Sequence, residues 1–185
     1  ICSGLSKIDS AIPIVSEEIF VDWQTRKKWN KYWLIDPLDG TKEFINKNDE
    51  FTVNIALIEN NKPVLGVIFV PALSTLYFAS QDHGSYKLYC SSNLSSLNES
   101  NKIQVNEKKR TNHLLVIGSR SHSNESFNQW VKENIEDYKL IKAGSSLKFC
   151  HIADGSADLY PRFGPTSEWD IAAGHIILME AGGSI

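Results

Sequence analysis

The chain has 185 residues, of which 42% are hydrophobic, and a formal net charge of −3 at pH 7. This composition is ordinary for a globular protein and excludes a disordered or fibrous chain. The negative charge excludes a nonspecific grip on a nucleic acid polymer, which depends on clustered Lys and Arg. The longest apolar runs, such as 64–72, are far shorter than the roughly 20 residues that cross a bilayer, so we expect no integral membrane segment.

The cysteines and the first residues bear on the cellular compartment. Cys2, Cys90 and Cys150 are an odd number without metal-ligand spacing, which favours free thiols in a reducing compartment. The first residues are interrupted by Ser, Gly, Lys and Asp, unlike a secretory signal peptide. We therefore expect a cytoplasmic location, with peripheral attachment at the inner membrane as an alternative. Oligomeric state is not readable from the sequence.

The first half of the chain predicts a strand, a short helix and an antiparallel meander. Apolar residues 32–35 lead into a tight turn, DPLDGT at 36–41, and the following TKEFI suits a short helix with Asp39 placed to cap it. Segments rich in β-branched and aromatic residues predict antiparallel strands at 52–58, 63–71 and 75–80. The polar stretch 90–101 predicts a solvated loop.

The second half alternates strands and helices. Strands are expected at 114–119, 138–143 and 157–162, and helices at 124–135 and 145–153. A last helix, which ends at Gly182 and Gly183, is expected from the residues at helical spacing: Trp169, Ala172, Ala173, Ile176, Ile177 and Glu180.

Four carboxylates are candidate metal ligands: Glu17 in VSEE, Asp36 and Asp39 in DPLDGT, and Asp170 in EWD. Magnesium prefers oxygen ligands and binds through carboxylates, water and substrate phosphate, so converging acids can hold two or three ions. Pro37 keeps Asp36 extended, which helps to present both aspartates at the end of the strand. Gly40 allows close backbone approach, and the N–H groups of Gly40 and Thr41 at a helix start suit phosphate oxygens.

Each acid also has an ordinary structural explanation, which is the more common one for a single residue. Asp39 could only cap the helix, and Asp36 could begin an Asx turn. Glu17 or Asp170 could lie in solvent or favour a helix N-terminus. Their combination in one chain favours the metal site.

DPLDGTKEF, preceded by SEE and followed by WDIAAGH and EAGG, resembles the signature pair of the inositol monophosphatase superfamily. The resemblance covers essentially the whole chain and implies an α/β fold, a layered αβαβα sandwich of the inositol monophosphatase and sugar phosphatase type. It implies an α+β lobe at 1–118 with the DPLDGT motif and a β/α lobe at 119–185 with nucleotide contacts and the last metal ligand. Relatives carry further residues at both ends, including an acid that pairs with Thr41, so we expect the chain to be truncated at both ends.

The resemblance also implies a catalytic apparatus. The metal ligands would be Glu17, Asp36, the Leu38 carbonyl, Asp39 and Asp170, holding two or three Mg²⁺ ions. The catalytic residues would be Glu17, Asp36, Asp39 and Thr41, of which Thr41 orients the attacking water. Inhibition by lithium is a further implication.

Within the superfamily the chain is most similar to bacterial CysQ-type 3'(2'),5'-bisphosphate nucleotidases, through DPLDGTKEF, FTVNIALI, SRSH, GSSLKFC and LYPRFGP. This likeness implies a phosphoric monoester hydrolase that converts adenosine 3',5'-bisphosphate (PAP) to AMP and phosphate. It further implies action on the related phosphosulfate (PAPS, giving APS) in sulfur assimilation. The alternatives are an inositol monophosphatase, a sugar bisphosphatase, and a non-catalytic fragment that binds an anion or nucleotide.

A nucleoside bisphosphate needs binding groups beyond the metals. Lys148, Ser145 and His122 match family positions that contact substrate, with Arg162 as a further candidate. The full substrate-binding set is Glu17, Asp39, Gly40, Thr41, His122, Ser145, Lys148 and Asp170. Without the resemblance, Lys148 would be read as a solvated residue and His122 as a helix cap. Tyr160, Phe163, Trp169, Cys150 and His151 are expected to be structural.

Overall fold

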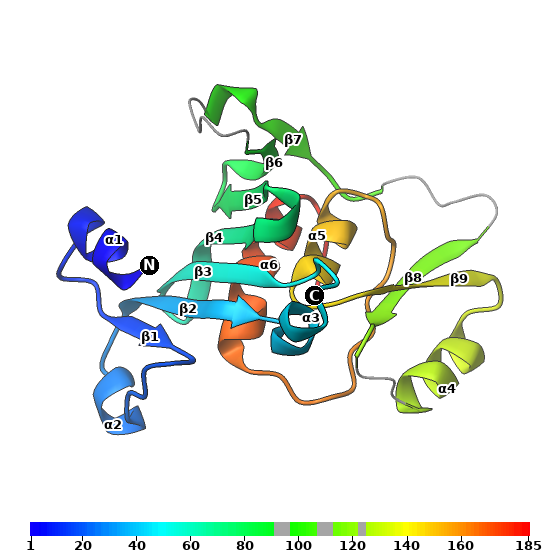
Figure 1. Ribbon diagram of the computed structural model, residues 1–185, viewed down its shortest axis with the longest axis horizontal. Helices are drawn as coiled ribbons and strands as arrows, with labels where there is room; N and C mark the ends of the chain where they lie inside the picture. Colours follow the sequence, from blue (N-terminus) through cyan, green and yellow to red (C-terminus); the bar gives the residue numbers. More distant parts are fainter. Residues whose placement is uncertain (91–96, 107–112, 122–124) are drawn as a thin grey trace.

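A seven-stranded mixed sheet is formed by the first part of the chain, and a two-stranded parallel sheet by the second (Figure 1). The computed structural model describes residues 1–90, 97–106, 113–121 and 125–185. The strands of the larger sheet follow in chain order: β1 (Ile14–Ser16), β2 (Lys31–Asp39), β3 (Thr52–Glu59), β4 (Lys62–Val70), β5 (Thr75–Ser80), β6 (Gly84–Tyr89) and β7 (Asn101–Ile103). Only the β1–β2 pair is parallel among these described strands.

The predicted meander is confirmed in β3, β4 and β5. Burial alternates along β3, because every second side chain faces the helices that cover the sheet. The β3–β4 hairpin turns at Asn60 and Asn61, which have φ values of 51° and 62°. Two residues in left-handed backbone match the right-handed twist of the strands, and Asn adopts this conformation readily.

The smaller sheet consists of β8 (Leu114–Ser119) and β9 (Tyr138–Ala143), linked through α4 (Glu125–Asn134). Both strands have the predicted bounds, and α4 lies within the predicted helix. The predicted strand at 157–162 is wrong: only Leu159 forms a bridge, with Val116 of β8. Pro161 has no N–H with which to continue the pairing.

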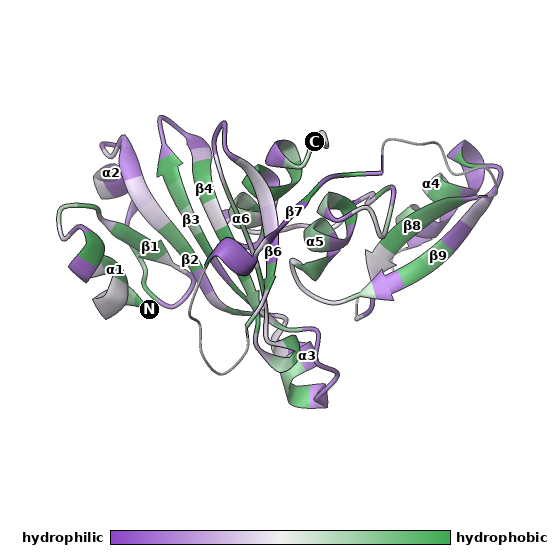
Figure 2. Ribbon diagram, turned by 90° about the horizontal axis from the view of Figure 1, so that it is seen from above, coloured by the Kyte–Doolittle hydropathy of each residue, from purple (hydrophilic) through white to green (hydrophobic). Residues whose placement is uncertain are grey.

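Helices α5 (Leu147–Ala153) and α6 (Glu168–Glu180) lie between the two sheets (Figures 1 and 2). α6 packs on β2 to β6, and α5 packs on α6 and β8. The contact is close: a Cβ on Gly66 of β4 would lie 2.4 Å from Cγ2 of Ile176, and one on Gly174 would lie 2.5 Å from Cγ of Phe149. These glycines therefore allow the strand and the helices to approach.

The other face of the large sheet contacts α1 (Cys2–Ile8), whose Leu5 packs with Trp33 and Ile35 of β2. The layers are therefore α1, the large sheet, α5 with α6, the small sheet and α4, which confirms the predicted layered α/β fold. The predicted lobe division between residues 118 and 119 falls within β8 and stays a prediction. In the described ranges, no helix has the length and apolar character to span a bilayer.

Short elements complete the fold: α2 (Trp23–Arg26), α3 (Thr41–Asn46) and the 3-10 turns at Pro71–Leu73 and Leu97–Glu99. The sequence predicted a helix at the start of the chain, where α1 lies, but it did not predict α2, β1, β6 or β7. In the predicted loop at 90–101, residues 91–96 lie outside the described part, and 97–99 form one of these turns.

Candidate active site

Asp36 and Asp39 lie at the end of β2, within a β-bulge. Asp36 is opposite Asn54, and Asp39 is opposite Thr52. Between these two pairs β2 advances by three residues and β3 by two, so β2 contains one extra residue. The predicted tight turn is therefore a bulged continuation of the strand, and α3 follows it directly at Thr41. Oδ1 of Asp36 accepts from the N–H of Leu38 at 2.9 Å, which is the expected Asx turn.

Asp39 does not cap α3, contrary to the prediction. The N-cap residue is Gly40, with φ of 87°, and it leaves the Asp39 side chain to face β3 and the start of α5. Oδ2 of Asp39 accepts from the Ser146 N–H at 2.5 Å, from Nδ2 of Asn54 at 3.2 Å and from Oγ1 of Thr52 at 3.4 Å. These bonds to one oxygen orient the carboxylate, and none of them uses Oδ1.

Asp170 is the third residue of α6, and its Oδ2 accepts from the Ser167 N–H at 3.0 Å and from Oγ1 of Thr166 at 2.9 Å. The expected helix-capping role is therefore present in a capping box. Glu17 is exposed and follows β1, whose parallel pairing brings it beside the end of β2.

The electrostatics link these four acids. Burial, the charge of Asp39, and the charge and hydrogen bonding of Glu17 raise the pKa of Asp36 to about 8. Burial, followed by the charge of Asp170, raises the pKa of Asp39 against the hydrogen bonds from Asn54 and Ser146. Mutual repulsion of buried carboxylates is relieved by protonation or by a bound cation.

The donor set fits a hard cation, because carboxylate and carbonyl oxygens are the ligands of Mg²⁺. Asp36, Asp39 and the Leu38 carbonyl come from one bulge, with Glu17 and Asp170 on neighbouring elements. Within the described ranges, however, no three His, Cys, Asp or Glu side chains gather closely enough to hold an ion between them. The predicted ligand set thus stays a prediction.

A cavity of about 300 Å³ adjoins this group. It contains six of the predicted site residues: Asp39, Gly40, Thr41, Ser145, Lys148 and Asp170. Glu17 and Asp36 are not in its lining, and His122 lies outside the described residues. The carboxylates of Asp39 and Asp170 and the ammonium of Lys148 thus border one small space, which can hold a phosphate between opposite charges.

Lys148 is buried, at 3% exposure, rather than solvated. Its Nζ donates to the Ser145 carbonyl at 2.6 Å and lies 5.5 Å from the centre of the Tyr160 ring. Burial, with help from Arg162, lowers the pKa of Lys148 to about 8, and Asp39 opposes this shift. A buried ammonium with few bonds favours an anionic partner.

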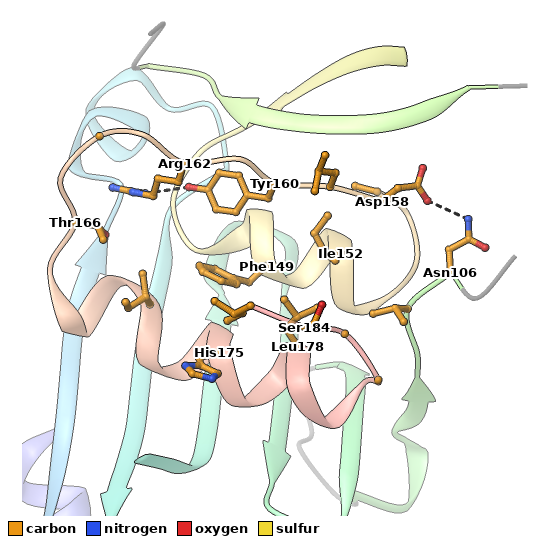
Figure 3. A pocket seen from close by; sticks show the side chains of 18 residues that line it. Asn106, Phe149, Ile152, Asp158, Tyr160, Arg162, Thr166, His175, Leu178 and Ser184 are labelled. Atoms are coloured by element: carbon orange, nitrogen blue, oxygen red, sulfur yellow. Dashed lines mark hydrogen bonds between the residues drawn. The ribbon is translucent and has the colours of Figure 1, made fainter. Parts of the chain in front are cut away.

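Tyr160 and Arg162 line both this cavity and a larger one of about 690 Å³, which Figure 3 shows. Nη1 of Arg162 donates to the Tyr160 hydroxyl at 3.0 Å. Arg162 therefore joins the site, and the Tyr160 ring is a wall residue as expected. The sequence missed Ser146, Thr52 and Asn54; polar residues on the buried face of an apolar strand were the available signal for the last two.

Comparisons with known proteins agree with this geometry. The model of the inositol monophosphatase family matches residues 1–185. CysQ of Salmonella typhimurium, named a 3'(2'),5'-bisphosphate nucleotidase, is 45% identical over 185 residues, which are 100% of this chain and 70% of that protein. The protein of the same name from Buchnera aphidicola is 49% identical over 182 residues, 98% of this chain and 64% of that protein. The chain thus spans about two thirds of these relatives.

Solved structures give the same result. CysQ from Bacteroides thetaiotaomicron superposes with a TM-score of 0.88 at 40% identity, over 98% of this chain and 71% of that one. SuhB of Mycobacterium tuberculosis has a TM-score of 0.78 at 22% identity, over 98% of this chain and 69% of that one, which shows the fold alone. The resemblance expected from DPLDGTKEF and WDIAAGH is confirmed. The chain belongs to the inositol monophosphatase family.

Proposed function

We propose that this chain carries the site of a magnesium-dependent phosphatase that removes the 3'-phosphate from adenosine 3',5'-bisphosphate, giving AMP and phosphate. One observation carries the proposal: the cavity of about 300 Å³ is lined by Asp39 and Asp170 together with the buried Lys148. The names of the CysQ relatives supply the substrate class. Action on PAPS, and thereby a place in sulfur assimilation, extends the same proposal.

Glu17, Asp36, Asp39, Asp170 and the Leu38 carbonyl would hold two or three Mg²⁺ ions. When bound, Mg²⁺ stabilises the negative charge that develops on the phosphoryl oxygens during hydrolysis. The hydroxyl of Thr41, at the first position of α3, would orient the attacking water. The hydrogen bonds to Oδ2 of Asp39 hold that carboxylate in one orientation, so little reorganisation is needed during the reaction.

The second phosphate of the nucleotide distinguishes this substrate from a simple monoester. Lys148 supplies a positive charge at the cavity, and Arg162 adds hydrogen-bond donors. The Ser145 hydroxyl lines the same cavity but donates to the Glu50 carbonyl at 2.7 Å. A buried ammonium gains more from an anion than an exposed one does, because water screens it less. The substrate would therefore be held by metal ions at one phosphate and by Lys148 at the other. The cytoplasmic location stays a prediction.

The test is release of phosphate from adenosine 3',5'-bisphosphate, measured beside inositol 1-phosphate and fructose 1,6-bisphosphate at equal Mg²⁺ concentration. The proposal expects the highest kcat/KM for the nucleotide. A preference for the inositol or sugar ester would replace the substrate assignment with the corresponding alternative. Calorimetry that shows nucleotide binding without hydrolysis at any Mg²⁺ concentration would instead support the non-catalytic alternative.

A further inference from the structure

The carboxylate of Glu50 joins two segments that border the site. Nε and Nη2 of Arg120 donate to the two carboxylate oxygens of Glu50, both at 2.6 Å. The N–H of Gly144 donates to Oε2 of Glu50 at 2.7 Å. Nη2 of Arg120 also donates to the Lys142 carbonyl at 2.8 Å. Glu50 therefore connects the residue after β8 with the turn after β9, through a planar two-bond pair that fixes its orientation.

The turn that Glu50 holds has an unusual backbone. Ser145 has φ of 44°, a left-handed conformation that is uncommon for residues other than Gly, and its Oγ donates to the Glu50 carbonyl at 2.7 Å. A Cβ on Gly144 would lie 2.4 Å from Cγ of Glu43 and 3.1 Å from Cβ of Glu50. Strained backbone persists where its surroundings determine it. The main-chain and side-chain contacts of Glu50 are such surroundings.

The same turn sets the positions of two groups in the cavity. The Ser145 carbonyl accepts from Nζ of Lys148 at 2.6 Å, and the Ser146 N–H donates to Asp39 at 2.5 Å. Nζ of Lys148 also donates to the Ala143 carbonyl at 3.4 Å, so two carbonyls beside the turn hold the ammonium in its position. Glu50 does not line the cavity. Glu50 can therefore affect a ligand only indirectly, through the turn or through its charge, which favours the ammonium form of Lys148.

We propose that Glu50 is a positioning residue, which fixes the Gly144–Ser145 turn and thereby aims the Lys148 ammonium at the phosphate of the nucleotide that is not hydrolysed. This inference rests on the proposed function. It predicts that the contribution of Glu50 to nucleotide affinity depends on Lys148. A residue that only stabilised the fold would contribute equally whether or not Lys148 was present.

A double-mutant cycle tests this dependence, with AMP as the probe because it keeps the phosphate in question. AMP affinity is measured by calorimetry in the presence of Mg²⁺ for the wild type, Glu50→Gln, Lys148→Ala and the double variant. Gln preserves the shape of Glu50 but removes the charge that holds Arg120. We expect Glu50→Gln to weaken binding about 10-fold in the wild type and by less than about 2-fold in Lys148→Ala.

Two further variants make the cycle decisive. Glu59→Gln is the control: it removes a surface ion pair with Lys31 on the large sheet, whose atoms are 3.5 Å apart, and should leave AMP affinity unchanged. Arg120→Lys keeps the Gly144 bond to Glu50 and loses the two-bond pair, so we expect a loss of about 3-fold that also vanishes without Lys148. If Glu50→Gln does not fold, as judged by circular dichroism, the Arg120→Lys cycle decides.

The outcomes separate the two proposals. Wild-type affinity in Glu50→Gln, or equal losses with and without Lys148, would overturn the positioning role and leave the proposed function standing. A wild-type protein that does not bind AMP at all would overturn the proposed function, and the positioning role with it. A loss of AMP affinity in Glu50→Gln that disappears in the Lys148→Ala background supports both the positioning role and the proposed function.

Discussion

Ser146 donates its backbone N–H to Oδ2 of Asp39 at 2.5 Å, across 107 positions of the sequence. Asp39 belongs to the bulge at the end of β2, and Ser146 directly precedes α5. The bond thus joins the segment that carries Asp39 to the start of the helix that carries Lys148. Because these two segments are fixed to each other, a change in one is expected to alter ligand binding at the other.

Replacing Asp39 with Asn tests the acidic side. Asn keeps a carbonyl oxygen that can accept from Ser146, but it lacks the charge that attracts a cation. We expect phosphate release from adenosine 3',5'-bisphosphate to fall by more than about 100-fold, with an unchanged circular dichroism spectrum.

The control for this variant is Asp49→Asn in the segment after α3. Asp49 is exposed and has φ of 64°, a conformation that Asn also adopts. Its activity should equal that of the wild type. An Asp39→Asn protein with wild-type turnover would refute the assignment of Asp39 as a metal ligand.

Removal of the Lys148 ammonium should distinguish substrates. Lys148→Ala is expected to lower kcat/KM for adenosine 3',5'-bisphosphate by at least about 10-fold more than kcat/KM for p-nitrophenyl phosphate, which has no second phosphate. Steady-state kinetics with both substrates measure the difference. Equal losses would count against a contact between Lys148 and the second phosphate.

The pH dependence of AMP binding should follow Lys148. Burial lowers the pKa of Lys148 to about 8, so the free protein already carries the ammonium below that pH. Above pH 8, binding an anion must first take up a proton, and affinity should fall up to about 10-fold per pH unit. The AMP phosphate does not contribute, because its second pKa is about 6.

Calorimetry between pH 7 and pH 9.5 measures this slope. Lys148→Arg is the matched variant, since the guanidinium stays charged throughout this range. With Mg²⁺ at a saturating concentration, which would keep the Asp36 carboxylate ionised although burial raises its pKa to about 8, the affinity of Lys148→Arg should be nearly independent of pH. A wild-type protein whose affinity is flat through pH 9 would contradict the role of the Lys148 ammonium.

The packing of α6 on the large sheet predicts a stability effect at Gly66. A Cβ there would lie 2.4 Å from Cγ2 of Ile176 and 2.6 Å from the Ala173 carbonyl, and the carbonyl cannot move without moving the helix. We expect Gly66→Ala to lower the free energy of unfolding by about 1–3 kcal/mol. Urea denaturation measures it. Gly4→Ala, in α1 with nothing within 4 Å of the new Cβ, should not be destabilised.

The elements that the sequence predicted well are those whose burial pattern is local. β8 is a short apolar strand with three consecutive buried residues, and α6 is a long run of mostly apolar residues, so these elements can be recognised from the residues themselves. β1 and β7 have three residues each and depend on neighbouring strands for their hydrogen bonds. Segments of that length carry too little periodicity to be recognised alone.

The candidate site shows the same limit. The acids of DPLDGT were found because the motif is contiguous, yet the partners of Asp39 come from β3 and from the residue before α5. Local spacing predicts that Asp39 caps α3. It cannot reveal that the fold brings the Ser146 N–H to the Asp39 carboxylate, which binds that donor instead of the N–H groups of α3. Glu50 likewise gains its partners Arg120 and Gly144 only through the tertiary fold.

The central claim is that Glu17, Asp36, Asp39 and Asp170 form a cation site. Anomalous diffraction from crystals soaked in Mn²⁺, which takes the place of Mg²⁺, tests it most directly. The account predicts anomalous peaks at about 2.0–2.2 Å from carboxylate oxygens of Glu17, Asp36, Asp39 and Asp170. Crystals that show Mn²⁺ only elsewhere on the protein, or none at all, would contradict it.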